Sequence, residues 1–238
     1  MDGIRERLER IRQRMAAAAR RAGRPPESVR LVAVSKTVEA ERIHEALQAG
    51  QVLFGENRVQ EARLKLPEVG PGAFWHLVGH LQRNKAKEAV RLFQMIHSVD
   101  SSELLRELER QAKKGAGHPL EVLVQVNVAR EPGKHGASAE ELPEILAEAA
   151  GMPHIRLAGL MILPPYDPDP ERSRPYFREL ADLARAMNGR RFENVSLREL
   201  SMGMSEDFEV AVEEGATLIR IGRALFGDRV PAGKKEQL

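Results

Sequence analysis

The residue whose type and position most clearly indicate a reactive group is a lysine at the end of a short apolar run. Lys36 follows LVAVS at 31–35, a β-branched run of the kind found in strands buried on both faces. A lysine amine that is partly desolvated loses proton affinity and becomes a nucleophile toward aldehydes and ketones. The alternative is a lysine that reaches solvent or pairs with a carboxylate. Position alone does not separate the two.

Residues near the end of the chain are suited to holding an anion. The segments SMGMSEDF at 201–208 and RIGRALFG at 220–227 each follow an apolar run. Ser201 offers a hydroxyl, and the amides of Gly222 and Arg223 begin a helix whose dipole favours negative charge. Two acidic residues in the first segment favour the second as the main phosphate cradle. Ordinary tight turns are the alternative.

Arg220 is a charged residue inside an apolar strand, where it needs a partner. Alternation places Leu218 and Arg220 on the inner face of that strand. The guanidinium then either pairs with an interior carboxylate, such as Glu199, or lies beside a ring nitrogen of a ligand. An amine, an anion cradle and this cation together describe an aromatic aldehyde that carries a phosphate. Pyridoxal 5′-phosphate has that layout.

The elements that must position these residues alternate regularly along the chain. Apolar runs predict eight strands, at 31–35, 52–54, 74–79, 95–99, 120–128, 155–162, 196–200 and 217–221. Helical patterns follow the first seven, at 39–49, 57–65, 83–92, 101–114, 139–150, 170–187 and 205–213, and the eighth leads into RALFG. A further helix precedes them at 4–22.

This alternation implies a parallel sheet. It predicts an α/β fold, a single (β/α)₈ TIM barrel domain over residues 1–238 with an extra N-terminal helix. An open doubly wound sheet is the alternative, but no G-x-G-x-x-G follows the first strand. Barrels of this kind bind ligands at the carboxyl ends of the strands, where Lys36 and the two anion-binding segments are expected.

Composition excludes several classes of function. The net charge of +2 gives no broad positive field for nucleic acid. The chain has no cysteine, which excludes disulfides, thiolate metal sites and a cysteine nucleophile, and no metal site is predicted. The charged N-terminus lacks the apolar core of a signal peptide, and no run is long enough to span a membrane. We therefore expect a cytoplasmic protein.

At the level of motifs, the chain resembles the pyridoxal phosphate homeostasis protein family, small barrels similar to the N-terminal domain of alanine racemase. The resemblance covers almost the whole sequence. It rests on seven segments in order: LVAVSKT (31–37), FGENRVQEA (54–62), WHLVGHLQRNK (75–85), KHG (134–136), LAGLMIL (157–163), LSMGMSEDF (200–208) and IRIGRALFG (219–227).

The resemblance also assigns residues to pyridoxal phosphate. It implies that Lys36 forms a Schiff base with the cofactor, that Asn57 lies near it, and that Arg220 faces the pyridine nitrogen. It implies that the phosphate is held by residues after the last two strands, namely Ser201, Met202, Gly222 and Arg223. Many members of that family carry Thr or Ser where this chain has Arg223, so we expect the backbone amide of that residue to make the contact.

Two features predict binding rather than turnover. An arginine beside the pyridine nitrogen offers only donors and keeps that nitrogen unprotonated, which weakens the ring as an electron sink. Racemisation needs a second acid or base on the opposite face, which the resemblance to alanine racemase implies is supplied by another domain, not expected in this chain. Other candidates are Tyr166, His80 and His135, each interpreted more readily as a loop or rim residue.

We therefore expect a monomeric protein that holds pyridoxal phosphate and passes it to apoenzymes. A small barrel-only amino-acid racemase is the main alternative. A Schiff-base aldolase acting on a phosphorylated sugar is a more distant one, because Arg220 has no role in it. Release of the cofactor requires that its link to Lys36 be broken, and Lys65, Lys85 and Lys134 are candidates for a second docking point.

Overall fold

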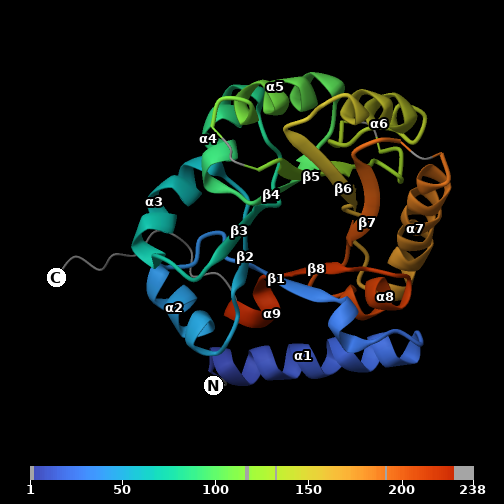
Figure 1. The fold of residues 1–238 in the computed structure, drawn as a ribbon. Coiled ribbons are helices and arrows are strands. Elements are labelled where there is room, and N and C mark those ends of the chain that lie inside the picture. Colours follow the sequence, from blue (N-terminus) through green and yellow to red (C-terminus); the bar gives the residue numbers. More distant parts are fainter. Residues whose placement is uncertain (1–2, 116–117, 132, 191, 228–238) are drawn as a thin grey trace.

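The computed structural model describes residues 3–115, 118–131, 133–190 and 192–227. Within this part, eight parallel strands close into a barrel in sequence order, as Figure 1 shows. The strands are β1 (Arg30–Val34), β2 (Leu53–Glu56), β3 (Phe74–Leu77), β4 (Met95–Val99), β5 (Leu120–Gln125), β6 (Ile155–Met161), β7 (Val195–Ser201) and β8 (Leu218–Ile221). The predicted barrel is confirmed. The last residues of the expected domain, 228–238, lie outside the described residues.

Helices surround the barrel in the predicted alternation (Figure 1). They are α1 (Ile4–Arg21), α2 (Ala40–Gln48), α3 (Val59–Val69), α4 (Ala86–Leu92), α5 (Ser102–Ala112), α6 (Leu142–Ala150), α7 (Arg174–Asn188), α8 (Phe208–Glu213) and α9 (Arg223–Phe226), with short 3₁₀ helices η1 (Pro26–Ser28), η2 (Arg83–Lys85) and η3 (Pro170–Ser173). Among the described residues, no helix combines the length and apolarity that crossing a membrane requires.

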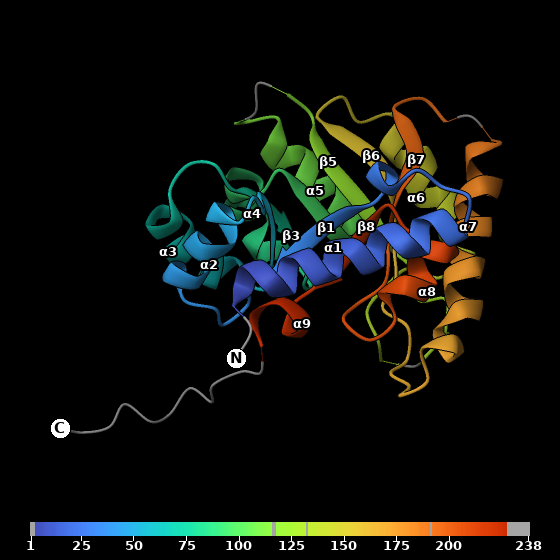
Figure 2. The same ribbon diagram turned by 90° about the horizontal axis from the view of Figure 1, so that it is seen from below.

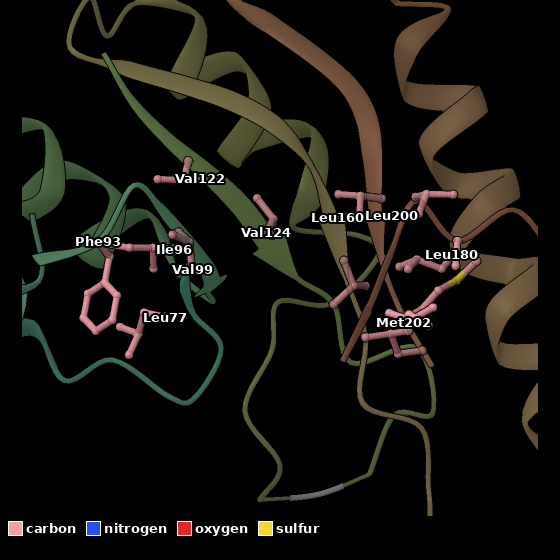
Figure 3. Packing of buried hydrophobic residues seen from close by; sticks show 14 of the residues in the cluster. Leu77, Phe93, Ile96, Val99, Val122, Val124, Leu160, Leu180, Leu200 and Met202 are labelled. Atoms are coloured by element: carbon pink, nitrogen blue, oxygen red, sulfur yellow. The ribbon is translucent and has the colours of Figure 1, made fainter. Parts of the chain in front are cut away.

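Alternation along the strands creates two separate apolar clusters. The barrel interior is filled by Val32, Val78, Met95, Leu123, Ala158, Met161 and Leu218. A larger cluster lies between the sheet and the helices, and in Figure 3 Leu160 and Leu200 lie close to Leu180 of α7. Met202, directly after β7, also belongs to this outer cluster. Its side chain therefore packs on the helix layer and not inside the barrel.

The N-terminal helix packs on the outside of the barrel, alongside α8 and α9 (Figure 2). It buries Ile4, Leu8 and Ile11, and each such side chain contributes roughly 1.5–3 kcal/mol when fully buried. Arg14 pairs with Glu209 of α8 at 2.8 Å. The apolar stripe of α1 thus covers the sector of the barrel where the chain closes, at β8 and β1.

Several predicted boundaries differ from the structure by a few residues, and two of the differences have a clear local reason. The strand predicted over 120–128 ends at Gln125, because Val126 bridges to Ala137 in the loop before α6. The helix predicted over 57–65 begins at Val59 and runs on to Val69, although it contains Pro67. A proline in the last turn removes one hydrogen bond where the helix is about to end, so it is tolerated there.

Candidate functional site

Lys36 lies in a tight turn that follows β1. The Val38 N–H donates to the Ser35 carbonyl at 2.9 Å, which closes a four-residue turn with Lys36 and Thr37 at its centre. Thr37 has a φ of 62°, a left-handed conformation that suits position i+2 of a type II turn but is unfavourable for a β-branched residue. The backbone around the lysine is therefore held in one unusual conformation.

A buried polar network holds this turn in place. The Ser35 hydroxyl donates to Glu56 Oε1 at 2.7 Å, and the Thr37 N–H donates to Glu61 Oε1 at 2.5 Å. Lys65 Nζ lies 2.7 Å from the Ser35 carbonyl oxygen and 2.8 Å from each of the two carboxylates. Burial raises the pKa of Glu56, and the Lys65 ammonium opposes that rise. We call these four side chains and Thr37 the turn network.

The turn network was largely missed by sequence reasoning. Glu61 and Lys65 look like an ordinary i,i+4 pair on the surface of a helix. In the structure Lys65 is only 8% exposed and Glu56 is fully buried. Lys65 was a candidate for a second docking point, but its ammonium already donates to three oxygens. The one available signal was Glu56, an acidic residue at the end of an apolar strand.

The anion-binding side is built around Ser201 at the end of β7. Its side chain is fully buried. Its Oγ accepts a hydrogen bond from Arg220 Nη1 at 2.6 Å and lies 2.8 Å from His97 Nδ1. Asp207 accepts from the Met204 N–H at 2.7 Å, so a carboxylate already occupies the start of α8. This agrees with the expectation that the turn after β8 is the better anion site.

Arg220 projects into the barrel, as alternation predicts. It pairs with Val32 across the β1–β8 ladder and is 4% exposed. Its Nη2 donates to the Ile162 carbonyl at 2.8 Å. The alternative partner Glu199 is bound instead to Arg30 at 2.6 Å. Burial lowers the pKa of Arg220 to about 10, so the guanidinium stays charged at neutral pH.

Two buried histidines extend this cluster through the barrel. His97 Nε2 lies 2.8 Å from His76 Nδ1. Burial lowers the pKa of His76 to about 3 and that of His97 well below its usual value, and nearby arginines lower both further. Both rings are therefore neutral at pH 7. We call Arg220, Ser201, His97 and His76 the barrel chain.

Neutral histidines allow two proton arrangements in the barrel chain. In one, the Ser201 hydroxyl donates to His97 and His97 donates to His76. In the other, His76 donates to His97 and His97 donates to Ser201, which then accepts twice and leaves its own proton free. The second arrangement presents a hydroxyl donor to an anion. A change of histidine tautomers in the barrel chain can therefore turn the Ser201 hydroxyl from a donor to His97 into a donor to a ligand, with no change in net charge.

The turn after β8 brings the remaining predicted residues, Gly222 and Arg223, to the end of β1. A Cβ on Gly222 would lie 3.2 Å from the Val34 carbonyl oxygen, so this glycine packs directly against the end of β1. Arg223 begins α9, and its guanidinium pairs with Glu206 at 2.7 Å. The Met202 N–H donates to the Leu218 carbonyl, which leaves it no proton for an anion. The backbone near Gly222 and Arg223 is better placed.

Asn57 follows β2, the neighbour of β1 in the barrel. Val34 and Gly55 are partners across the β1–β2 ladder, so Asn57 and Lys36 leave adjacent strands at the same rim. The Asn57 Oδ1 and Glu56 Oε2 atoms are buried and have no hydrogen-bond partner among the described residues. Buried acceptors of this kind are uncommon unless a ligand or water supplies the donor.

The histidines considered as a second acid or base lie together at the same rim as Lys36, in the loops that follow β3 and β5. His80 and His135 stack with ring centroids 3.6 Å apart and an interplanar angle of 11°. Asp100 Oδ2 lies 3.3 Å from His80 Nδ1 and 3.8 Å from His135 Nδ1. These atoms are close enough for a metal ion, but a ring nitrogen binds a metal in its own plane. Two parallel rings cannot both do so without rotating.

Comparisons with known proteins identify the family of this chain. A family model described as alanine racemase, N-terminal domain, matches residues 7–230. A pyridoxal phosphate homeostasis protein from Aquifex aeolicus is 43% identical, over 94% of this chain and 97% of that protein. The chain therefore belongs to the pyridoxal phosphate homeostasis proteins, a family of barrels that share the N-terminal domain of alanine racemase.

Solved structures extend the comparison to three dimensions. PipY from Synechococcus elongatus PCC7942, determined without pyridoxal phosphate, is 40% identical and superposes with a TM-score of 0.85. The same protein with pyridoxal phosphate bound superposes with a TM-score of 0.81. Both matches cover 94% of this chain and the whole of PipY.

Proposed function

We propose that this chain binds pyridoxal 5′-phosphate as a Schiff base on Lys36 and serves vitamin B6 homeostasis. The observation that carries the proposal is the meeting of four consecutive strands at one rim. Ser201 ends β7, Arg220 lies in β8, Lys36 follows β1 and Asn57 follows β2. A relative of similar length whose structure holds the cofactor supports the proposal.

The residues at this rim fit the groups that the cofactor carries. Lys36 would supply the amine for the covalent link to the aldehyde, and the buried Asn57 Oδ1 would accept a hydrogen bond from a ligand hydroxyl. The residues that would hold the phosphate are Ser201, through its hydroxyl, and Met202, Gly222 and Arg223, through their backbone. Of these the Met202 amide is the weakest candidate, since it already donates within the sheet.

Arg220 decides how the bound ring behaves. When bound, pyridoxal phosphate supplies an aldehyde and a ring that withdraws electrons. Neither hydrogen-bond partner of Arg220 is a carboxylate, so no neighbouring negative charge offsets the guanidinium there, and it would offer N–H donors to the pyridine nitrogen. A donor at that atom holds the nitrogen unprotonated, which makes the ring a weak electron sink.

We infer a carrier and not an efficient enzyme. Tyr166 is 77% exposed, so neither its position nor its environment suggests a base. A single barrel domain over residues 1–238, a monomer in the cytoplasm, and delivery to pyridoxal-phosphate-dependent apoenzymes complete the proposal. The rim pair His80 and His135, beside Asp100, is the feature that favours a barrel-only racemase as the second candidate.

An absorption spectrum of the purified protein, before and after borohydride, tests the proposal. We expect a visible-range band that borohydride removes, with the reduced cofactor left on the protein. A protein that stays colourless after incubation with pyridoxal phosphate would refute it. Deuterium exchange at the α-carbon of alanine or serine tests the racemase, and a rate above that of free cofactor would favour that candidate.

A further inference from the structure

Lys65 donates all the protons that an ammonium has. It lies on α3, is 8% exposed, and its three acceptors are the Ser35 carbonyl, Glu56 Oε1 and Glu61 Oε1. A lysine ammonium has three N–H donors and no acceptor. Each of its protons is therefore directed at one oxygen, and the nitrogen has no lone pair with which to attack an aldehyde.

Its acceptors fix the backbone on both sides of Lys36. On the N-terminal side, the Ser35 carbonyl oxygen accepts hydrogen bonds from both the Lys65 ammonium and the Val38 N–H. On the C-terminal side, the Thr37 N–H donates to Glu61, the carboxylate that Lys65 also holds. Lys36 is thus the central residue of a turn whose two flanks are tied to one ammonium.

The turn needs such support because its conformation is unfavourable on its own. Thr37 has a φ of 62°, where a β-branched side chain is strained and persists only if its surroundings impose it. Removing Lys65 would release the Ser35 carbonyl and leave Glu61 free to move away from Thr37. The turn would then relax toward a conformation with negative φ, and the direction of the Lys36 side chain would change with it.

We propose that Lys65 is a positioning residue for Lys36: it clamps the strained turn and, because it is fully hydrogen-bonded, leaves Lys36 as the amine that reacts. This rests on the proposed function, in which Lys36 carries the cofactor. The sequence thus places two lysines at one site, and hydrogen bonding gives one of them a structural role. The same argument removes Lys65 from the candidates for a second docking point.

The test compares Lys65→Met with a matched control. Lys87→Met removes an exposed lysine from α4 and should behave as the parent chain. Because Lys65→Met leaves the buried Glu56 carboxylate without its cation, the variant Glu56→Gln with Lys65→Met is measured beside it. The double variant keeps the buried site neutral and separates a failure to fold from a failure to position Lys36.

Two readouts are taken on each protein. The first, on protein freed of cofactor, is the rate at which Lys36 reacts with a small acylating reagent at fixed pH, followed by peptide mass spectrometry. The second is the apparent affinity for pyridoxal phosphate from the visible band. We expect both to fall at least about tenfold in the folded Lys65 variants, since a misplacement of ~1 Å can cost on the order of a hundredfold.

The outcomes separate this inference from the proposed function. If the parent chain gives no borohydride-sensitive band, the proposed function fails, while the labelling rates of Lys36 still test the clamp. If the parent chain binds the cofactor and the folded double variant matches it in both readouts, the clamp is refuted. Acylation of Lys65 at a rate similar to Lys36 in the parent chain would also refute it.

Discussion

The barrel chain and the turn network each bury a cation in the same barrel, but with opposite kinds of partner. Arg220 in the barrel chain has a hydroxyl and a carbonyl as partners, whereas Lys65 in the turn network has two carboxylates and a carbonyl. The first cation keeps its positive charge available to a ligand. The charge of the second cation is neutralised by the carboxylates of Glu56 and Glu61. The comparison teaches that a buried cation can serve binding or architecture, and its partners decide which.

The largest expected effect comes from breaking the turn network. Lys65→Met leaves Glu56 buried and unpaired, and removing one partner of a buried ion pair costs about 3–5 kcal/mol. We expect a loss of that size in the free energy of unfolding, measured by urea denaturation at pH 7. Adding Glu56→Gln should restore most of it, and Lys87→Met should change little. Equal stability of the parent and Lys65→Met would show that the pair contributes nothing.

The barrel chain should make stability depend on pH in a defined direction. The pKa of His76 is lowered to about 3, so between pH 6.5 and 3 the unfolded chain binds a proton that the folded chain does not. Stability then rises with pH across this window, by about 1.4 kcal/mol per unit for one group. Below pH 3 and above pH 6.5 this contribution is constant.

His76→Asn checks that origin, because asparagine keeps a hydrogen-bonding atom near the Nδ1 position but does not titrate. Urea denaturation at several pH values should give a shallower slope for the variant than for the parent chain. Some slope remains, since His97 titrates in the same direction. An unchanged slope would mean that His76 is already protonated in the folded state at pH 5.

A third variant pair compares two arginines of β8 and α9. Arg220→Met removes a buried charged donor, and hydrogen bonds to charged groups contribute about 1.5–3 kcal/mol. Retention of pyridoxal phosphate during dialysis should therefore weaken roughly 10- to 100-fold. Arg223→Met removes a guanidinium that pairs with Glu206, and its side chain is 64% exposed, so retention should change by less than about threefold. Equal effects would contradict the assigned roles.

The smallest expected effect concerns the strained residue itself. Thr37→Gly places a residue with no Cβ at a φ of 62°, which removes the strain but adds freedom to the unfolded chain. These effects oppose each other, so we expect the free energy of unfolding to change by less than about 1 kcal/mol. Cofactor affinity should fall only slightly while Lys65 still holds the turn. A large loss of affinity would assign the Thr37 side chain a direct role.

The fold was predictable because its pattern is local. The strand at 95–99 and the helix ends at Ile4 and Asn188 are marked within a few residues by apolar periodicity. The predicted helix over 57–65 stops short of the end of α3, which runs to Val69 with Pro67 in its last turn. The placement of Arg220 inside the barrel followed from alternation alone, because the period of a strand is two.

The site was only partly predictable, because the roles of residues such as His97 and Lys65 depend on contacts between segments that are distant in the sequence. His97 lies in an apolar strand and gives no sign that it meets Ser201, 104 residues away. Lys65 looks like a surface lysine until the turn after β1 is placed against α3. The sequence shows which polar groups lie at the ends of strands. It does not show which of these groups form hydrogen bonds with one another in the folded protein.

The central claim is that Lys36, held by its turn, is the amine that carries the cofactor. Its most direct test is borohydride reduction of the protein loaded with pyridoxal phosphate, followed by peptide mass spectrometry of every lysine. The account predicts one modified residue at stoichiometric level, Lys36, with Lys65 unmodified. Modification chiefly at Lys65, or spread over surface lysines such as Lys134, would contradict it.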